Sequence, residues 1–236
     1  MKIIRSFYIV TFCALFLGGY TRAVIVITTA TGTGADSYVN YGSNQGVNYG
    51  SSETAQVLMG SSNDYLRKAY FRFDLSSVSG SITEATLSFR VTSPDNLTGG
   101  GPVKLYGLND GVTGEDWSET GITWSNAPAN TLGDTAALDS NATELAAFAN
   151  INSTTTTVNF TSEILSFLQA DTDNNVTFIV TGGSYLTGSP IRYNFYTKEN
   201  TSTEPFPTLA ITTIPEPSSI ALILIALTTL VWVRRR

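Results

Sequence analysis

The middle of the sequence alternates apolar and polar side chains with a period of two residues. In residues 85–91 the odd-numbered positions are Ala, Leu, Phe and Val, and the even-numbered positions are polar. Phe71, Phe73 and Leu75 repeat the pattern. This period places one set of side chains in a core and the other in water, as in a half-buried β-strand. These segments therefore predict strands.

Further short segments rich in β-branched and aromatic residues are separated by Gly, Asn, Ser and Asp, as turns require. They are residues 24–28, 55–59, 103–108, 155–160, 176–181, 191–197 and 207–212. Many short strands predict an all-β protein, and we expect a single jelly-roll β-sandwich domain. Apolar residues at helical spacing predict one short helix over residues 161–170. Residues 139–157, rich in Ala, Thr, Ser and Asn, predict a loop or a weakly structured excursion.

The chain has no histidine, and its single cysteine, Cys13, lies in the N-terminal apolar run. These absences exclude Ser-His-Asp and Cys-His nucleophiles, zinc sites with His or Cys ligands, and a disulfide framework. Residues 24–214 hold seven of the 13 Lys and Arg residues and 18 of the 19 Asp and Glu residues, a net charge of −11. So acidic a body disfavours nucleic acid as a partner and permits calcium.

The N-terminal segment is typical of a secretory signal peptide. Lys2 and Arg5 precede an apolar run that ends at Leu17, and Ala23 is a small residue at a suitable cleavage position. We therefore expect residues 1–23 to be a signal peptide that is cleaved after Ala23. An uncleaved anchor is the alternative.

The C-terminal segment, residues 215–236, has three parts in a fixed order. These are Pro215-Glu216-Pro217, the uncharged residues 220–233, and Arg234-Arg235-Arg236. An apolar run with a basic flank predicts a C-terminal transmembrane helix with its arginines in the cytoplasm. The two ends together predict an exported domain at the cell surface, anchored in the cytoplasmic membrane transiently or stably.

This order of parts resembles the PEP-CTERM sorting signal of bacteria that make extracellular polysaccharide. The resemblance implies an exosortase-type membrane protease as a partner. Pro215, Glu216 and Pro217 would then be the recognition element, and the tail would be removed. A tail anchor that stays in the membrane is the alternative.

Between the two ends, a series of short motifs resembles the DNRLRE domain over about residues 35–212. They are residues 36–39, 48–50, 66–67, 70–76, 82–87, 116–124, Pro128, Phe195, 198–199 and 205–209. Of the six-residue motif that gives this domain its name, only Leu66 and Arg67 are present in this sequence. The resemblance implies a jelly-roll sandwich in secreted polysaccharide-acting proteins, some of which are carbohydrate-binding modules for alginate-type acidic glycans.

Sugar binding requires aromatic rings that stack on the sugar and polar groups that replace water, and an acidic glycan also requires cations. The predicted ligand-binding residues are Tyr38, Tyr49, Arg67, Arg72, Trp117, Arg192 and Tyr193. The alternative for each is a structural role, in the core or in a surface ion pair. Asp36 is a predicted ligand of a structural Ca²⁺ ion. Residues 171–175 resemble the start of a calcium loop but lack its later glycine and glutamate.

The sequence therefore predicts a non-catalytic protein that binds or organises extracellular polysaccharide, including uronate-rich polymers. A structural matrix protein or adhesin without saccharide specificity is one alternative. A glycan lyase or hydrolase is another, for which Glu115, Asp116 and Glu119 supply neighbouring carboxylates. We assign no catalytic residue.

Overall fold

The computed structural model describes residues 22–59, 66–92, 102–133, 136–148, 155–182, 191–201 and 207–214. Its strands are β1 (Ala23–Thr28), β2 (Ala35–Asn40), β3 (Thr54–Met59), β4 (Arg67–Asp74), β5 (Ser81–Thr92), β6 (Val103–Leu108), β7 (Ala142–Phe148), β8 (Thr155–Phe160), β9 (Asn175–Gly182), β10 (Ile191–Tyr196) and β11 (Thr208–Ile214). One α-helix, α1 (Ser162–Ala170), and a 3-10 turn at Gly42–Asn44 complete the described elements.

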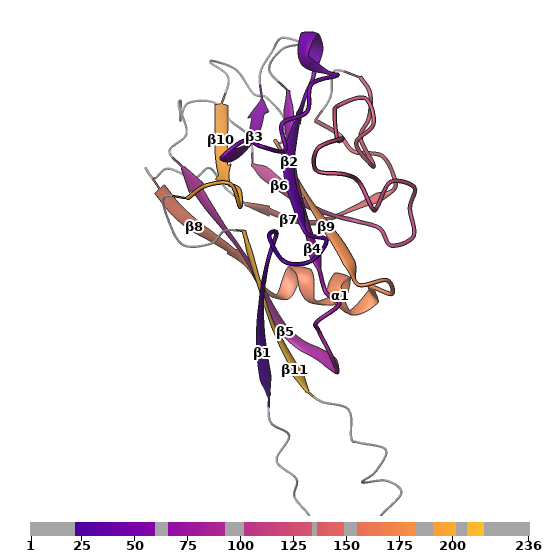
Figure 1. Ribbon diagram of the computed structural model, residues 1–236, viewed down its shortest axis with the longest axis vertical. Helices are drawn as coiled ribbons and strands as arrows, with labels where there is room; N and C mark the ends of the chain where they lie inside the picture. Colours follow the sequence, from indigo (N-terminus) through magenta and orange to yellow (C-terminus); the bar gives the residue numbers. More distant parts are fainter. Residues whose placement is uncertain are drawn as a thin grey trace, which may run out of the picture.

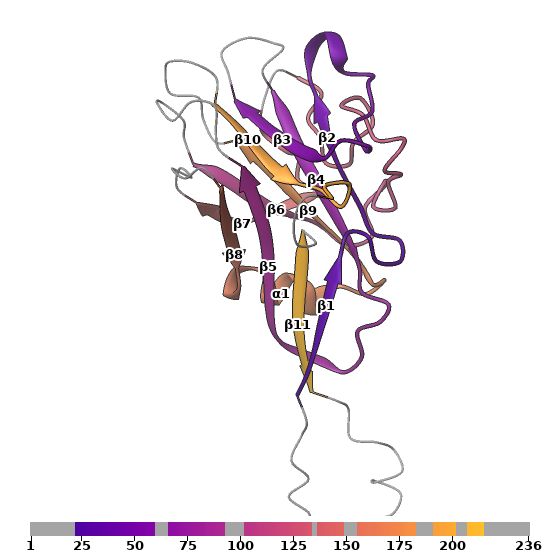
Figure 2. The ribbon, with the colours of Figure 1, turned by 60° about the vertical axis from the view of Figure 1, so that its left-hand side comes forward.

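The strands pair in the order β1-β11-β5-β10-β3-β4-β9-β6-β7, with β2 added to β4 and β8 added to β5. The two halves of this series meet at one register pair, Leu58 with Arg67, and face each other across a shared core (Figures 1 and 2). Phe71 of β4 accordingly lies 4.7 Å from Phe89 of β5 and 6.1 Å from Phe195 of β10, measured between ring centroids. The predicted all-β sandwich is confirmed.

The period-two pattern explains which side chains form the core. Leu87, Phe89 and Val91 are fully buried, and the polar residues between them lie on the outer face of β5. The predicted helix is also confirmed, because Ile164 and Leu168 of α1 are buried in the same core.

A second apolar cluster covers the outer face of the layer formed by β4, β9 and β6. The long segment between β6 and β7 contributes Trp117, Ile122 and Trp124 to it, and they pack on Tyr70 and Ile179. Both tryptophans are therefore core residues.

Two strands depart from the sequence prediction. The loop predicted for residues 139–157 contains β7, which pairs with β6. Its alternation is broken by a register shift opposite Leu105 and Tyr106, which explains why the pattern did not reveal it. β2 was not predicted as a strand, because all six of its residues are buried and none marks a polar face.

The first and last strands pair, with Ala23 opposite Thr213, so both ends of the domain lie together. β3 and β10 lie at the opposite end of the long axis (Figures 1 and 2). In the part of the chain that is described, no helix is both long and apolar enough to cross a bilayer. The apolar run of the predicted signal peptide and all of residues 215–236 lie outside that part.

Candidate functional site

Three neighbouring strands bring two arginines onto one surface. Leu58 of β3 pairs with Arg67 of β4 on one side and with Arg192 of β10 on the other. Residues directly opposite each other in paired strands project from the same face. Arg67 Nη1 also donates a hydrogen bond to Oε1 of Gln56. Gln56 pairs with Asn194, two residues along each strand from the pair formed by Leu58 and Arg192, so both side chains project from this same face.

A third arginine extends this surface across β5. The Arg90 guanidinium lies 5.9 Å from the ring centroid of Tyr196, which is the last outward residue of β10. All of these polar side chains are half-buried. We call the surface formed by Gln56, Arg67, Arg90, Arg192, Asn194 and Tyr196 the arginine face.

Among the described residues, the three lysines of the domain make their contacts away from this surface. Lys104 pairs with Glu144 at 2.8 Å, and Lys198 pairs with Glu119 at 2.6 Å. Lys68 is buried beneath the second apolar cluster. Since β3 and β10 contain no acidic residue, the arginine face is a positive surface on an otherwise acidic domain.

Two tyrosines stack beside Arg67. The ring centroids of Tyr38 and Tyr49 are 4.2 Å apart, and the Arg67 guanidinium lies 5.9 Å from the Tyr38 centroid. Tyr38 is only 7% exposed, whereas Tyr49 is half-buried and forms the outer member of the stack. Burial raises the pKa of the Tyr38 hydroxyl above its ordinary value, and the charges of Arg67 and Arg192 partly oppose that rise.

Four of the seven residues predicted from the sequence thus lie together: Tyr38, Tyr49, Arg67 and Arg192. Tyr38, which the sequence suggested as a sugar-binding ring, is itself buried and stacks on Tyr49. Tyr193, also predicted to bind ligand, is 1% exposed, because it faces the core together with Phe195.

Arg72 and Trp117 lie together in a different place. Trp117 is buried and donates from Nε1 to Thr177 Oγ1 at 3.1 Å. Arg72 lies 5.3 Å from the Trp117 ring and donates to the carbonyl oxygens of Thr33 and Trp117. These contacts hold the long segment after β6 against β4.

Sequence reasoning did not single out Gln56, Arg90, Asn194 or Tyr196. The sequence does indicate part of this surface, since the alternation of β10 places residues 192, 194 and 196 on one face of the strand. The pairing of β10 with β3 and β5, which adds Gln56 and Arg90, depends on contacts between distant parts of the chain.

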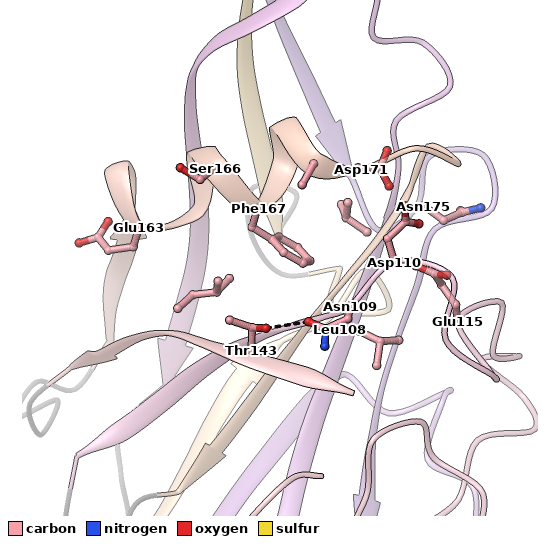
Figure 3. Close-up of a pocket in the computed structure, with 13 residues that line it drawn as sticks. Leu108, Asn109, Asp110, Glu115, Thr143, Glu163, Ser166, Phe167, Asp171 and Asn175 are labelled. Carbon is pink, nitrogen blue, oxygen red and sulfur yellow. Dashed lines mark hydrogen bonds between the residues drawn. The ribbon is translucent and has the colours of Figure 1, made fainter. Parts of the chain in front are cut away.

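A separate pocket of about 340 Å³ lies between α1 and strands β6, β7 and β9 (Figure 3). Asp110, Glu115 and Asp171 gather at one end of it, and the ring of Phe167 projects into the middle. Burial raises the pKa of Asp171 to about 6 and also raises that of Glu115, and neighbouring carboxylates add to both shifts. An acidic pocket of this kind repels a polyanion.

The turn after α1 explains the string that resembles a calcium loop. Asp171 Oδ2 accepts from the Asn174 backbone N–H at 3.0 Å, and Asp173 Oδ1 accepts from that of Asn175 at 2.8 Å. These carboxylates therefore cap a polar turn between helix and strand.

The three neighbouring carboxylates of the sequence belong to different surroundings. Glu115 lines the acidic pocket and accepts from the Gly111 backbone N–H at 2.7 Å. Asp116 is exposed, and Glu119 is bound by Lys198. The structure thus does not gather them in one cleft.

Asp36, the predicted calcium ligand, is fully buried at the start of β2. Thr29 Oγ1 and the Lys198 backbone N–H donate to its Oδ2. Burial raises the pKa of Asp36 to about 8, and the negative charge of Glu199 contributes to the rise. Asp36, Glu119 and Glu199 form a group whose ligand oxygens lie within 4.8 Å of one another.

Comparison with known proteins identifies the domain. A search of curated proteins finds no match to this chain. The family model described as carbohydrate-binding module family 96 matches residues 27–213, which include every strand from β2 to β10 and most of β1 and β11. This agrees with the binding-module part of the sequence resemblance and with a domain that binds carbohydrate. The chain therefore belongs to carbohydrate-binding module family 96.

Proposed function

We propose that the arginine face binds an acidic, uronate-type polysaccharide without cleaving it. The observation that carries the proposal is that three of the seven cations in residues 24–214 gather on one face of a domain with a net charge of −11. Guanidinium groups bind carboxylates through two parallel hydrogen bonds, which makes arginine the preferred partner for such groups.

The spacing of the arginines suits a polymer better than a single sugar. Arg67 and Arg192 flank β3 and are therefore about 10 Å apart at their backbones. Each can contact a different carboxylate of one chain laid across the strands. Tyr49, at the edge of the same surface, offers a ring face to the apolar side of a sugar.

We further propose that the protein is exported, with residues 1–23 as its signal peptide and residues 215–236 as a PEP-CTERM tail recognised by an exosortase-type protease. Residues 24–214 would be the jelly-roll module. The paired ends of β1 and β11 support this arrangement, since β3 and β10 lie at the far end of the domain (Figure 1). An anchored protein would then hold the arginine face away from the membrane.

Affinity electrophoresis tests the binding proposal. We expect retardation in gels that contain alginate or polygalacturonate, and none in gels that contain a neutral glucan. Arg192→Ala and Arg67→Ala should each reduce retardation. The matched control is Lys104→Ala, which removes a cation paired with Glu144 and should leave retardation unchanged.

No retardation of the folded protein by any glycan would refute the binding proposal and favour a structural role in the matrix. Shortening of the polymer during the run would favour a lyase or hydrolase. Export is tested separately by mass spectrometry of the protein isolated from its native cell. We expect a mature chain that begins at Val24 and lacks the C-terminal segment; an intact chain of 236 residues would contradict this.

A further inference from the structure

Three carboxylates lie next to the stacked tyrosines and take no part in the proposed glycan contacts. Asp36 of β2, Glu119 of the segment after β6 and Glu199 after β10 place one oxygen each within 4.8 Å of the other two. They come from segments far apart in the sequence. The fold itself, rather than a local turn, therefore brings them together.

The oxygens of this group are incompletely satisfied. Asp36 is 0% exposed, and its Oδ1 is buried without a hydrogen-bond donor among the described residues. Glu199 Oε2 is likewise buried without a hydrogen-bond donor among the described residues. Leaving a buried charged oxygen unpaired is costly, so such groups are normally paired or coordinate a metal.

The charges of the group do not balance. The Lys198 ammonium binds both oxygens of Glu119, at 2.6 and 2.7 Å, and neutralises one of the three carboxylates. Asp36 and Glu199 remain as two neighbouring acids without a cation of their own. Burial, together with the negative charge of Glu199, raises the pKa of Asp36.

We propose that Asp36, Glu119 and Glu199 bind a divalent cation that prefers oxygen ligands, of the Ca²⁺ type. Ca²⁺ accepts carboxylates in one- or two-oxygen mode and completes a flexible shell with water, whereas Mg²⁺ demands a near-ideal octahedron. Glu119 and Glu199 are half-buried, so the ion has a route from solvent. The ion compensates the charges of Asp36 and Glu199 and lies near the Lys198–Glu119 pair.

Such an ion would stabilise the segments that carry the tyrosine stack. Asp36 lies two residues before Tyr38 in β2. On the other side, Asn48 Nδ2 donates to the Glu119 carbonyl oxygen at 2.7 Å, next to Tyr49. The site is therefore a structural one, and it acts whether or not a glycan is bound.

The second acidic group of the described residues provides a control. Asp110, Asp171 and Asp173 also bring their oxygens within 4.8 Å of one another, but Asp110 and Asp173 are exposed. The carboxylates of this group accept hydrogen bonds from residues of the turn after α1, with Asp110 accepting from Thr172.

The test uses the full-length protein, freed of metal with a chelator, in the absence of any glycan. Calorimetric titration with CaCl₂ should show one strong Ca²⁺ site for each chain. At 100-fold excess over the dissociation constant, the melting temperature should rise by about 5–10 °C. Asp36→Asn should weaken Ca²⁺ binding about tenfold or more, and Asp110→Asn should leave it unchanged.

If Asp36→Asn does not fold, Glu199→Gln decides, because Glu199 is half-buried and its replacement keeps the shape of the side chain. Absence of both binding heat and thermal shift in the unaltered protein would overturn the proposal. Loss of binding in Asp110→Asn but not in Glu199→Gln would overturn it too. A normal Ca²⁺ response without glycan retardation would refute only the proposed glycan binding.

Discussion

Tyr38 and Tyr49 stack with an angle of 19° between their rings, although one lies in β2 and the other in the loop that leads to β3. The inner ring belongs to the main core and lies 5.9 Å from the Arg67 guanidinium, and the outer ring packs against that core. The pair thus connects the packing of the sandwich to the arginine face. The two tyrosines therefore have different predicted roles.

Replacement of Tyr49 should affect binding more than stability. Tyr49→Ala removes the outer ring, and we expect the affinity for an acidic glycan to fall about fivefold or more, since an aromatic contact is worth roughly 1 kcal/mol beyond its buried area. Tyr38→Ala instead leaves a cavity and should lower the free energy of unfolding by about 3 kcal/mol. Isothermal calorimetry and urea unfolding separate the two effects.

Tyr49→Phe is the matched control, because it keeps the ring and removes only the hydroxyl. It should bind glycan nearly as well as the unaltered protein. If Tyr49→Ala binds as tightly as Tyr49→Phe, the outer ring does not contact the sugar.

Replacement of Trp117 should have the opposite outcome. The residue is buried and its Nε1 donates to Thr177 Oγ1, so Trp117→Ala should lower the free energy of unfolding by about 3–5 kcal/mol. Trp117→Phe leaves the Thr177 hydroxyl without that partner and should cost about 1–3 kcal/mol. Glycan affinity, measured well below the melting temperature, should be unchanged for both variants. A selective loss of affinity in a stable Trp117→Phe protein would restore the sequence-based assignment.

The sequence was sufficient for those features that depend on local periodicity. Alternation identified β4 and β5, and helical spacing identified α1. Alternation did not identify β2, because its residues pack into both apolar clusters. Tyr38 faces the main core, whereas Ala35 and Val39 face the second cluster. A strand covered on both faces has no polar set to mark its period.

For the candidate site, the sequence could indicate which residue types bind an acidic glycan, but not which of those residues lie together. Arg67 and Arg192 were identified because arginine suits carboxylates, and the structure then placed them on either side of Leu58. Arg72 is chemically equivalent, yet it holds a loop through carbonyl oxygens. Which arginine faces solvent depends on strand pairing between distant segments, which no local pattern contains.

Gly107 of β6 has no room for a side chain. A Cβ at this position would lie 2.5 Å from Cε2 of Phe167, which α1 holds over the strand. Gly107→Ala should therefore lower the free energy of unfolding by about 1–3 kcal/mol through overpacking. Gly46→Ala, which meets no atom within 4 Å, is the matched control.

Chemical denaturation of a double-mutant cycle checks this explanation. Phe167→Ala removes the ring that the new methyl group would meet, so Gly107→Ala should cost much less in that background. An equal cost in both backgrounds would show that the strand requires glycine for another reason.

Lys68 makes the stability of the domain depend on pH above neutrality. Its side chain is buried 4.7 Å from the Trp124 ring, and its ammonium donates to Asn130 Oδ1 and to the Ala137 carbonyl oxygen, both at 2.7 Å. Burial lowers the pKa of Lys68 from 10.5 to about 7, and the charge of Asp139 opposes this shift only in part.

The sign of the effect follows from the protons bound in each state. Between about pH 7 and pH 10.5 the unfolded chain keeps the Lys68 proton and the folded chain releases it, so the unfolded state binds more protons. Stability should therefore rise with pH across this window, by roughly a few kcal/mol at most. Below pH 7 both states are charged, and the full cost of burying the ammonium is present.

Urea unfolding from pH 6 to pH 9 should show this rise in the unaltered protein and not in Lys68→Met, because methionine has no proton to release. Parallel pH profiles for the two proteins would show that Lys68 keeps its charge in the folded state.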